Sequence, residues 1–120
     1  MRPLLFCLAL TLPLMACDSA EPDVPLLRIE NVGALDFTAV TIEHAGQEVS
    51  FGVVAAGATS EYRSIDEATE AMLVLLRLGD LDRAFVPAHD GYGARLPDGR
   101  YTYEISVDAE GYVGVELERD

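Results

Sequence analysis

Residues 100–118 read RYTYEISVDAEGYVGVELE, and through most of this stretch large apolar side chains alternate with polar ones. Two runs share one face: Tyr101, Tyr103, Ile105 and Val107, and then Val113, Val115 and Leu117. A period of two is typical of a β-strand with one buried face. The residues DAEG at 108–111 separate the two runs, so the stretch predicts a β-hairpin.

The same alternation continues upstream, with turn residues at short intervals. It occurs in LLRIEN at 26–31, TAVTIEH at 38–44 and EVSFGVV at 48–54. In the last of these runs we expect Val49, Phe51 and Val53 to point inward. About seven short strands result, and they predict a single small antiparallel β-sandwich that covers residues 26–120.

Residues 64–79, SIDEATEAMLVLLRLG, admit two interpretations. Ser64 and Glu67 have the spacing of a capping box, and Gly79 could end a helix. The apolar run MLVLL is, however, short enough for a central strand, and strands are predicted on both sides of it. We favour a loop or a single helical turn at 65–70, followed by a strand at 71–78.

The segment LPDGRYTY at 96–103 resembles the approach to the tyrosine corner of immunoglobulin-like domains. The resemblance implies that Tyr101 is the corner residue, and we expect Gly99 to occupy a turn. Tyr103 stands where antibody domains have a cysteine, so no pinning disulfide is implied. FGVVAAGATSEY and LPDGRYTYEISV are together similar to small envelope lipoproteins that carry an all-β domain of unassigned activity.

The first residues, MRPLLFCLALTLPLMAC, have one positive charge at Arg2 and then an apolar segment that ends at Cys17. This segment is shorter than the roughly 20 residues of a membrane span, and it has the outline of a secretory signal. Leu14 to Cys17, LMAC, resembles the lipobox of bacterial lipoproteins. We therefore predict a signal peptide at 1–16, a lipidated cysteine with an acidic tether at 17–25, and the folded domain at 26–120.

The lipobox resemblance implies that Cys17 becomes the first residue and carries diacylglycerol and an acyl chain such as palmitate. The expected address is a bacterial cell envelope, periplasmic or surface-exposed, with the membrane as a partner through the lipid. Asp18 fits a retention signal, an export signal or simply an extended tether. Cys7 would leave with the signal peptide, so no cysteine would remain for a disulfide.

After residue 16 the chain has seven arginines, no lysine and 21 acidic residues, a formal charge of −14. Nucleic-acid binding requires clustered positive charge, so we expect no nucleic-acid partner.

The sequence offers little for catalysis. Its two histidines are His44, at the end of a predicted strand, and His89, which lies beside Asp90 in a loop. Neighbouring residues do not by themselves orient a carboxylate onto an imidazole, and no nucleophile elbow, phosphate loop or zinc spacing accompanies them. We expect no enzyme activity, no catalytic residues and no cofactor.

Two functional classes remain. The first is a lipid-anchored accessory or protein-interaction module, whose interaction residues the sequence does not specify. The second is a domain that binds a small ligand, a carbohydrate or calcium. Calcium could use loop carboxylates, although no EF-hand spacing is present and we expect no metal site; these residues are Asp80, Asp82, Asp90 and Asp98. The aromatic candidates for a carbohydrate are Tyr62, Tyr92 and Tyr112.

Overall fold

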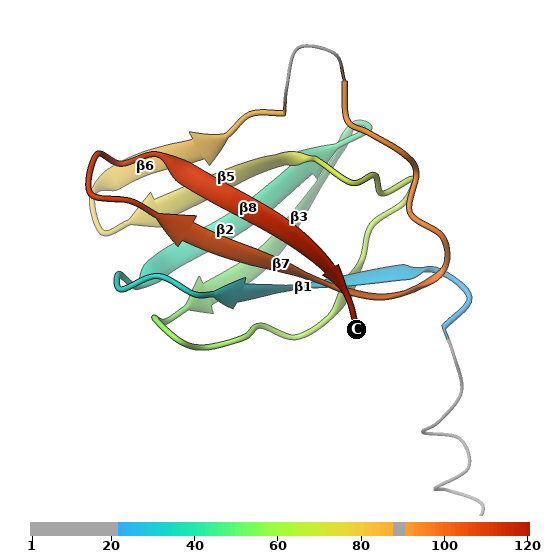
Figure 1. Cartoon of the computed structure of the whole chain (residues 1–120), viewed down its shortest axis with the longest axis horizontal. Helices are drawn as coiled ribbons and strands as arrows, with labels where there is room; N and C mark the ends of the chain where they lie inside the picture. The colour runs from blue at the N-terminus through green and yellow to red at the C-terminus, as the bar shows by residue number, and fades with distance from the viewer. Residues whose placement is uncertain (1–21, 88–90) are drawn as a thin grey trace, which may run out of the picture.

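A computed structural model describes residues 22–87 and 91–120, which form two four-stranded sheets packed face to face (Figure 1). The first sheet contains, in spatial order, β4 (Arg63–Ser64), β1 (Pro25–Asn31), β7 (Gly99–Val107) and β8 (Val113–Arg119). The second contains β3 (Gln47–Val54), β2 (Phe37–His44), β5 (Leu73–Leu78) and β6 (Leu81–Phe85). The predicted β-sandwich is confirmed. The structure has eight strands where about seven were predicted, and one of them, β4, has only two residues. One neighbouring pair, β1 and β7, is parallel.

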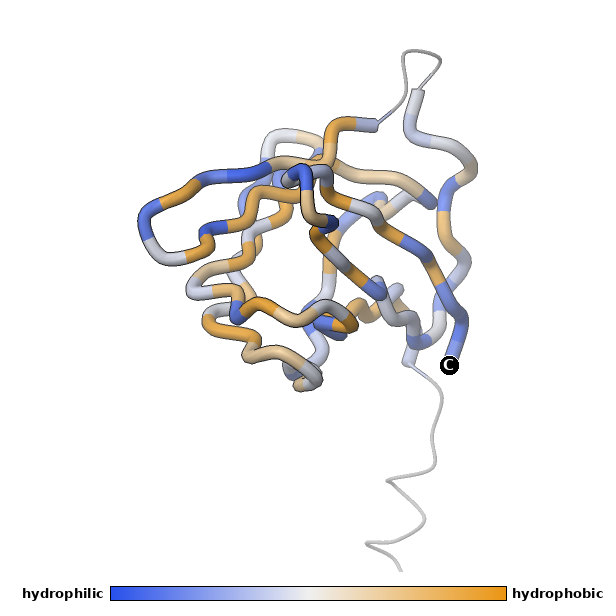
Figure 2. The backbone as a smooth tube through the Cα atoms, turned by 60° about the vertical axis from the view of Figure 1, so that its left-hand side comes forward, coloured by the Kyte–Doolittle hydropathy of each residue, from blue (hydrophilic) through white to orange (hydrophobic). Residues whose placement is uncertain are grey.

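The hairpin predicted from residues 100–118 is the pair β7 and β8, in unbroken register from Tyr101 opposite Arg119 to Val107 opposite Val113. The carboxylate of Asp108 shapes its turn by accepting hydrogen bonds from the amides of Glu110 and Tyr112, both at 2.9 Å. In Figure 2, hydrophobic and hydrophilic residues alternate along much of the chain. The buried members of this pattern face the other sheet and form the core.

The predicted tyrosine corner is present. The Tyr101 hydroxyl donates a hydrogen bond to the Pro97 carbonyl at 2.7 Å, four residues upstream. Gly99 has φ +146°, a conformation that is essentially restricted to glycine. The turn before β7 is therefore fixed by one hydroxyl and one glycine.

Residues 65–78 follow the favoured interpretation of the sequence, a loop and then a strand. Residues 65–70 form turns and a single bridge, not a helix, and Glu67 has φ +57°. The strand β5 begins at Leu73, two residues later than predicted, and Val74 and Leu76 point into the core. Hydrogen bonds to β2 and β6 on both sides stabilise this segment as a strand, because tertiary pairing outweighs the local helix propensity.

The prediction that Val53 points inward is wrong. Val53 is 70% exposed, whereas Val54 is 1% exposed and belongs to the core. The cause is a register shift between β2 and β3 around Gly52, which has φ +74°. Such a bulge inserts one residue into the strand and turns every later side chain to the opposite face.

Asn31, at the end of β1, is a buried polar residue that holds the neighbouring loop. Its amide nitrogen donates to the carbonyl oxygens of Leu35 at 2.7 Å and Val54 at 3.0 Å. Its amide oxygen accepts a hydrogen bond from the Gly33 amide at 3.0 Å. One side chain thereby fixes the loop 32–36 against the ends of β1 and β3.

Candidate functional site

Strand directions give the sandwich two distinct ends. At one end β1 and β7 begin, at Pro25 and Gly99, and β8 finishes. At the opposite end lie the loop 32–36 and the turns 79–80 and 108–112, on the left in Figure 1. We call these three segments, with the strand residues next to them, the loop end. It lies at the far end of β1 from the point where the chain enters the sandwich.

Large exposed hydrophobic residues concentrate at the loop end. Leu35 is 54% exposed, Leu81 is 55% exposed and Tyr112 is 74% exposed, and Val32 is also exposed there. They come from the loop 32–36, the first residue of β6 and the turn 108–112. An isolated exposed leucine is unremarkable, but several on one end of a small domain are typical of a binding surface.

These segments enclose a hollow of about 190 Å³. Leu35 lines one side, Leu78 and Leu81 come from the hairpin of β5 and β6, and Val107 comes from the end of β7. The turn 108–111 completes the wall. We call this feature the loop-end hollow.

Arg83 of β6 crosses from the second sheet to the turn of the first and also lines the loop-end hollow. Its guanidinium lies so close to Gly111 that a Cβ atom there would stand 2.9 Å from Arg83 Nε. Arg83 Nη1 also donates a hydrogen bond to the Asp82 carbonyl at 2.9 Å. A glycine in the turn is what allows this arginine to close the gap between the two sheets.

Acidic side chains occupy the segments around the loop-end hollow: Asp36, Asp80, Asp82, Asp108 and Glu110. Asp82 Oδ1 lies 3.4 Å from Arg77 Nη1, and the carboxylates of Asp36 and Asp108 accept backbone amides of neighbouring residues. Among residues 22–87 and 91–120, no arginine forms an ion pair with Asp80 or Glu110. The rim of the hollow therefore keeps negative charge exposed to solvent.

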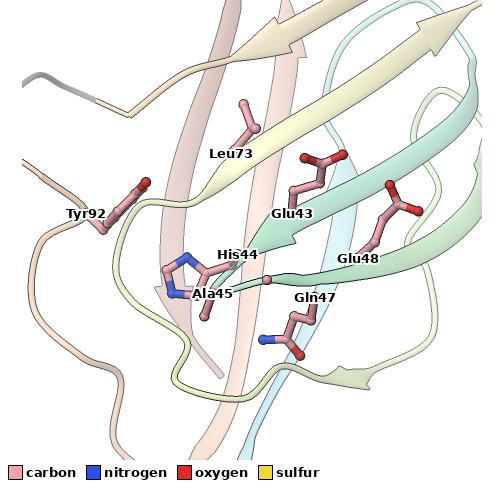
Figure 3. A pocket seen from close by; sticks show the side chains of 8 residues that line it. Glu43, His44, Ala45, Gln47, Glu48, Leu73 and Tyr92 are labelled. Carbon is pink, nitrogen blue, oxygen red and sulfur yellow. The ribbon is translucent and has the colours of Figure 1, made fainter.

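A larger and more polar hollow of about 420 Å³ lies where β2 and β3 meet, at the far end of β2 from the loop end (Figure 3). Glu43 and Glu48 are cross-strand neighbours, and Leu73 is the register partner of Glu43 on β5. The rings of His44 and Tyr92 meet edge to face, with their centroids 5.3 Å apart. We call this feature the hairpin hollow.

His44 lies at the end of β2, as predicted, and its ring is already engaged. Its Nε2 donates a hydrogen bond to the Glu67 carbonyl at 2.9 Å. The Gln47 amide nitrogen donates to the Asp66 carbonyl at 2.7 Å, so both residues tie the hairpin to the turn after β4. These hydrogen bonds give His44 the role of a structural link between the hairpin and this turn.

Three of the four carboxylates considered for calcium are described by the structure, and these three are not brought together. Asp80 and Asp82 lie at the loop end, whereas Asp98 lies just before the start of β7, at the other end. Asp90 and His89 fall outside the described residues. Within the described ranges, no three histidine, cysteine, aspartate or glutamate side chains are grouped closely enough to hold a metal ion.

The aromatic candidates are also separated. Tyr92 lies beside His44, Tyr112 lies in the turn at the loop end, and Tyr62 contacts the residue that follows β8. They do not form one aromatic platform of the kind that stacks on a sugar.

Sequence reasoning missed a polar cluster around Tyr62 on the outer side of the first sheet. The Tyr62 hydroxyl donates a hydrogen bond to Asp120, and Thr102 Oγ1 donates to the same carboxylate at 2.7 Å. Arg28 Nε donates to Thr102 Oγ1 at 3.0 Å, and its guanidinium lies 4.9 Å from the centre of the Tyr62 ring. The strand pattern could have paired Arg28 with Thr102 across β1 and β7, but nothing local indicated Tyr62 or Asp120.

This cluster shifts two pKa values. Partial burial favours the protonated form of Asp120, but the hydrogen bonds from Tyr62 and Thr102 and the charges of Arg28 and Arg100 outweigh it and lower the pKa of this carboxyl. Burial, followed by the hydrogen bond to Asp120, raises the pKa of Tyr62. The cluster joins β1, β7 and the segment after β8, so we interpret it as structural.

Comparisons with known proteins support the fold. No family model and no curated protein matches the chain. The NMR structure of a protein from Eubacterium rectale is similar, with a TM-score of 0.57 and 14% identity over 82% of this chain and 91% of that one. The crystal structure of a candidate cell adhesion protein from Bacteroides uniformis is similar with a TM-score of 0.59 and 15% identity, over 83% of this chain.

The chain spans about half, 51%, of the Bacteroides uniformis protein. At these identities the likeness shows a shared β-sandwich fold and nothing about ligands. In the described part of the chain, no helix has the length and hydrophobicity of a membrane span. Cys17, the predicted lipidation site, lies outside the described residues. The comparisons support a small β-sandwich, and the geometry shows exposed hydrophobic residues at its loop end.

Proposed function

We propose that this chain is a non-catalytic protein-interaction module of a bacterial cell envelope, anchored by lipid on Cys17, that binds a protein partner with its loop end. One observation carries the proposal: the exposed hydrophobic residues Leu35, Leu81 and Tyr112 gather at the end of the sandwich opposite the start of β1. A chain tethered through residues 17–25 would present this end away from the membrane.

Two further points support the proposal. Loops at one end of a sandwich carry recognition in many β-sandwich domains, because the sheets hold the loops rigidly while the loop sequences vary. One similar structure belongs to a candidate cell adhesion protein, and a role in contact with other proteins fits a domain of this kind.

Photo-crosslinking in intact cells tests the proposal. A photoreactive amino acid replaces Leu81 at the loop end or, as a control, Glu48 in the hairpin hollow. We expect protein adducts with the probe at position 81 and few with the probe at position 48. Adducts from position 48 alone, or equal adducts from both, would contradict the assignment of the loop end.

A second function is favoured by the hairpin hollow, where Tyr92 and His44 stand beside the polar side chains of Glu43, Gln47 and Glu48. An aromatic face among carboxylate and amide groups is a suitable setting for a small polar ligand such as a carbohydrate. Titration of the protein with neutral oligosaccharides, followed by NMR of the His44 ring protons, tests it. Unchanged ring signals at millimolar sugar would exclude this function.

A further inference from the structure

We infer that the loop-end hollow accepts an apolar side chain presented by a basic segment of a partner protein. The inference rests on the proposed function, because it names the chemistry of the partner at that same surface. Three observations carry it: the apolar walls of the hollow, the way these walls are held in place, and the charge on its rim.

Apolar side chains supply most of the walls of the hollow, beside the charged Arg83, Asp108 and Glu110, and these walls are fixed by strands or hydrogen bonds. Leu78 and Leu81 face each other as register partners across the tight turn of β5 and β6. The Leu35 carbonyl is held by the buried amide of Asn31, and the turn 108–111 is held by the carboxylate of Asp108. The hollow is therefore preformed, so a ligand would not have to order loops as it binds.

Around the hollow five carboxylates outnumber two arginines, Arg77 and Arg83, of which only Arg77 forms an ion pair with a described residue. The Arg83 guanidinium lies against Gly111 and bonds the Asp82 carbonyl, while Arg77 pairs with Asp82 at 3.4 Å. Asp80 and Glu110 form no ion pair with any described arginine, and they flank the hollow in its two turns. A partner segment with lysine or arginine beside its apolar residue would complement this rim.

A second copy of this chain is a poor occupant by the same reasoning. Each copy has a formal charge of −13 and would present the same acidic rim, so two loop ends would repel each other. That charge instead attracts basic partners over distance and speeds their encounter.

Methyl NMR of the full-length protein in detergent micelles tests the inference with three synthetic probes, KKFKK, SSFSS and EEFEE. Phenylalanine in the hollow would shift nearby methyl signals through its ring current. We expect KKFKK to shift the methyl groups of Leu35, Leu81 and Val107. We expect SSFSS to bind more weakly and EEFEE to produce no shifts. Added salt should weaken the binding of KKFKK.

Matched variants locate the binding. Leu81→Ser should weaken KKFKK roughly tenfold because it removes most of one apolar wall. Val86→Ser is its control, because Val86 is 70% exposed but follows the far end of β6. Glu110→Lys should also weaken KKFKK, whereas Glu48→Lys in the hairpin hollow should leave it unchanged. Circular dichroism verifies that each variant is folded.

Several results would overturn the inference: equal binding of KKFKK and SSFSS, stronger binding of EEFEE, or shifts confined to other surfaces. Loop-end methyl shifts that depend on protein concentration alone would mean that a second copy occupies the hollow, and would overturn it as well. Crosslinks from position 81 in cells, combined with no preference for KKFKK, would leave the proposed function standing and reject only the basic partner. Selective binding of KKFKK without crosslinks would instead count against the proposed function.

Discussion

Tyr101 shows how a single hydroxyl can determine the path of the chain, because it joins the start of β7 to Pro97 at 2.7 Å. Tyr101→Phe removes this hydrogen bond and little else, and should lower the free energy of unfolding by about 1 kcal/mol. For a domain of this size that loss lowers the melting temperature by roughly 4–8 °C. Thermal melts test it, with the exposed Tyr112→Phe as a matched control. Equal melting of Tyr101→Phe and wild type would contradict a structural role for the hydroxyl.

Gly99 lies in the same corner and is expected to be more sensitive. At φ +146° a Cβ atom would also approach Arg119 Nη2 to 2.7 Å. Gly99→Ala should therefore cost on the order of 1–3 kcal/mol in backbone strain. Gly33→Ala is the control, since a Cβ there meets its neighbours at 3.6 Å without positive φ. Chemical denaturation of both variants compares them, and similar losses would exclude strain at Gly99 as the cause.

The lowered pKa of Asp120 predicts that the stability of the fold depends on pH. Its pKa is lower in the folded protein than in the unfolded chain, so its contribution to stability is present above the unfolded pKa and is lost as pH falls through the folded pKa. Asp120→Asn should melt below wild type at neutral pH, and the difference should shrink in acid. Melting curves measured from neutral to strongly acidic pH test this. A constant difference at all pH values would assign the effect to packing.

At this scale the sequence was informative where a residue acts on its own neighbourhood. LPDGRY was enough to predict the corner, because Tyr101 reaches only four residues back. The cluster of Tyr62, Thr102 and Asp120 was not predictable, because the sequence separation of its hydrogen-bonded pairs reaches 58 residues. Only the assembled sheet brings them together.

At the scale of the strand, β3 offers a test of register. Val53 and Val54 are neighbours, yet Val53 faces solvent and Val54 lies in the core. Val54→Ala should lower the free energy of unfolding by about 2 kcal/mol, because it removes buried apolar surface and leaves a cavity. Val53→Ala should stay within about 0.5 kcal/mol of wild type. Denaturant unfolding of the pair measures both, and the reverse order of losses would mean that β3 has no bulge.

The errors of sequence interpretation at this scale share one cause. Alternation correctly predicted both strands of the hairpin at 100–118, where one face packs against the core, fully buried along most of β7 and partly buried along β8. The same alternation predicted the wrong inward residue after Gly52. A bulge there turns the following side chains to the other face of the sheet, and the composition of the strand gives no sign of it. Residues 65–78 were ambiguous for a related reason. Their helix propensity can be read from the local sequence, whereas the pairing with β2 and β6 that makes β5 a strand depends on the assembled sheet.

At the scale of the whole molecule, the loop-end hollow has no signature in the sequence. Its walls come from residues 35, 78, 81, 83 and 107–111, and each of these segments alone resembles an ordinary turn with apolar neighbours. From the sequence, the charge of the chain leads only to the expectation that it has no nucleic-acid partner, because net charge is a sum over all residues and needs no fold. The position of the hollow requires the topology of both sheets.

A lipid anchor on Cys17 would set how the loop end is presented to a partner. If LMAC directs lipidation, wild-type protein should incorporate a clickable palmitate analogue and sediment with membranes. Cys17→Ala should lose the label and be released, because each methylene of the missing chains contributes about 0.8 kcal/mol to membrane binding. Cys7→Ala is the matched control and should remain labelled, because Cys7 lies within the segment expected to be removed. Loss of label in both variants, or wild-type protein that is soluble and unlabelled, would contradict an anchor at Cys17 and with it the outward orientation of the loop end.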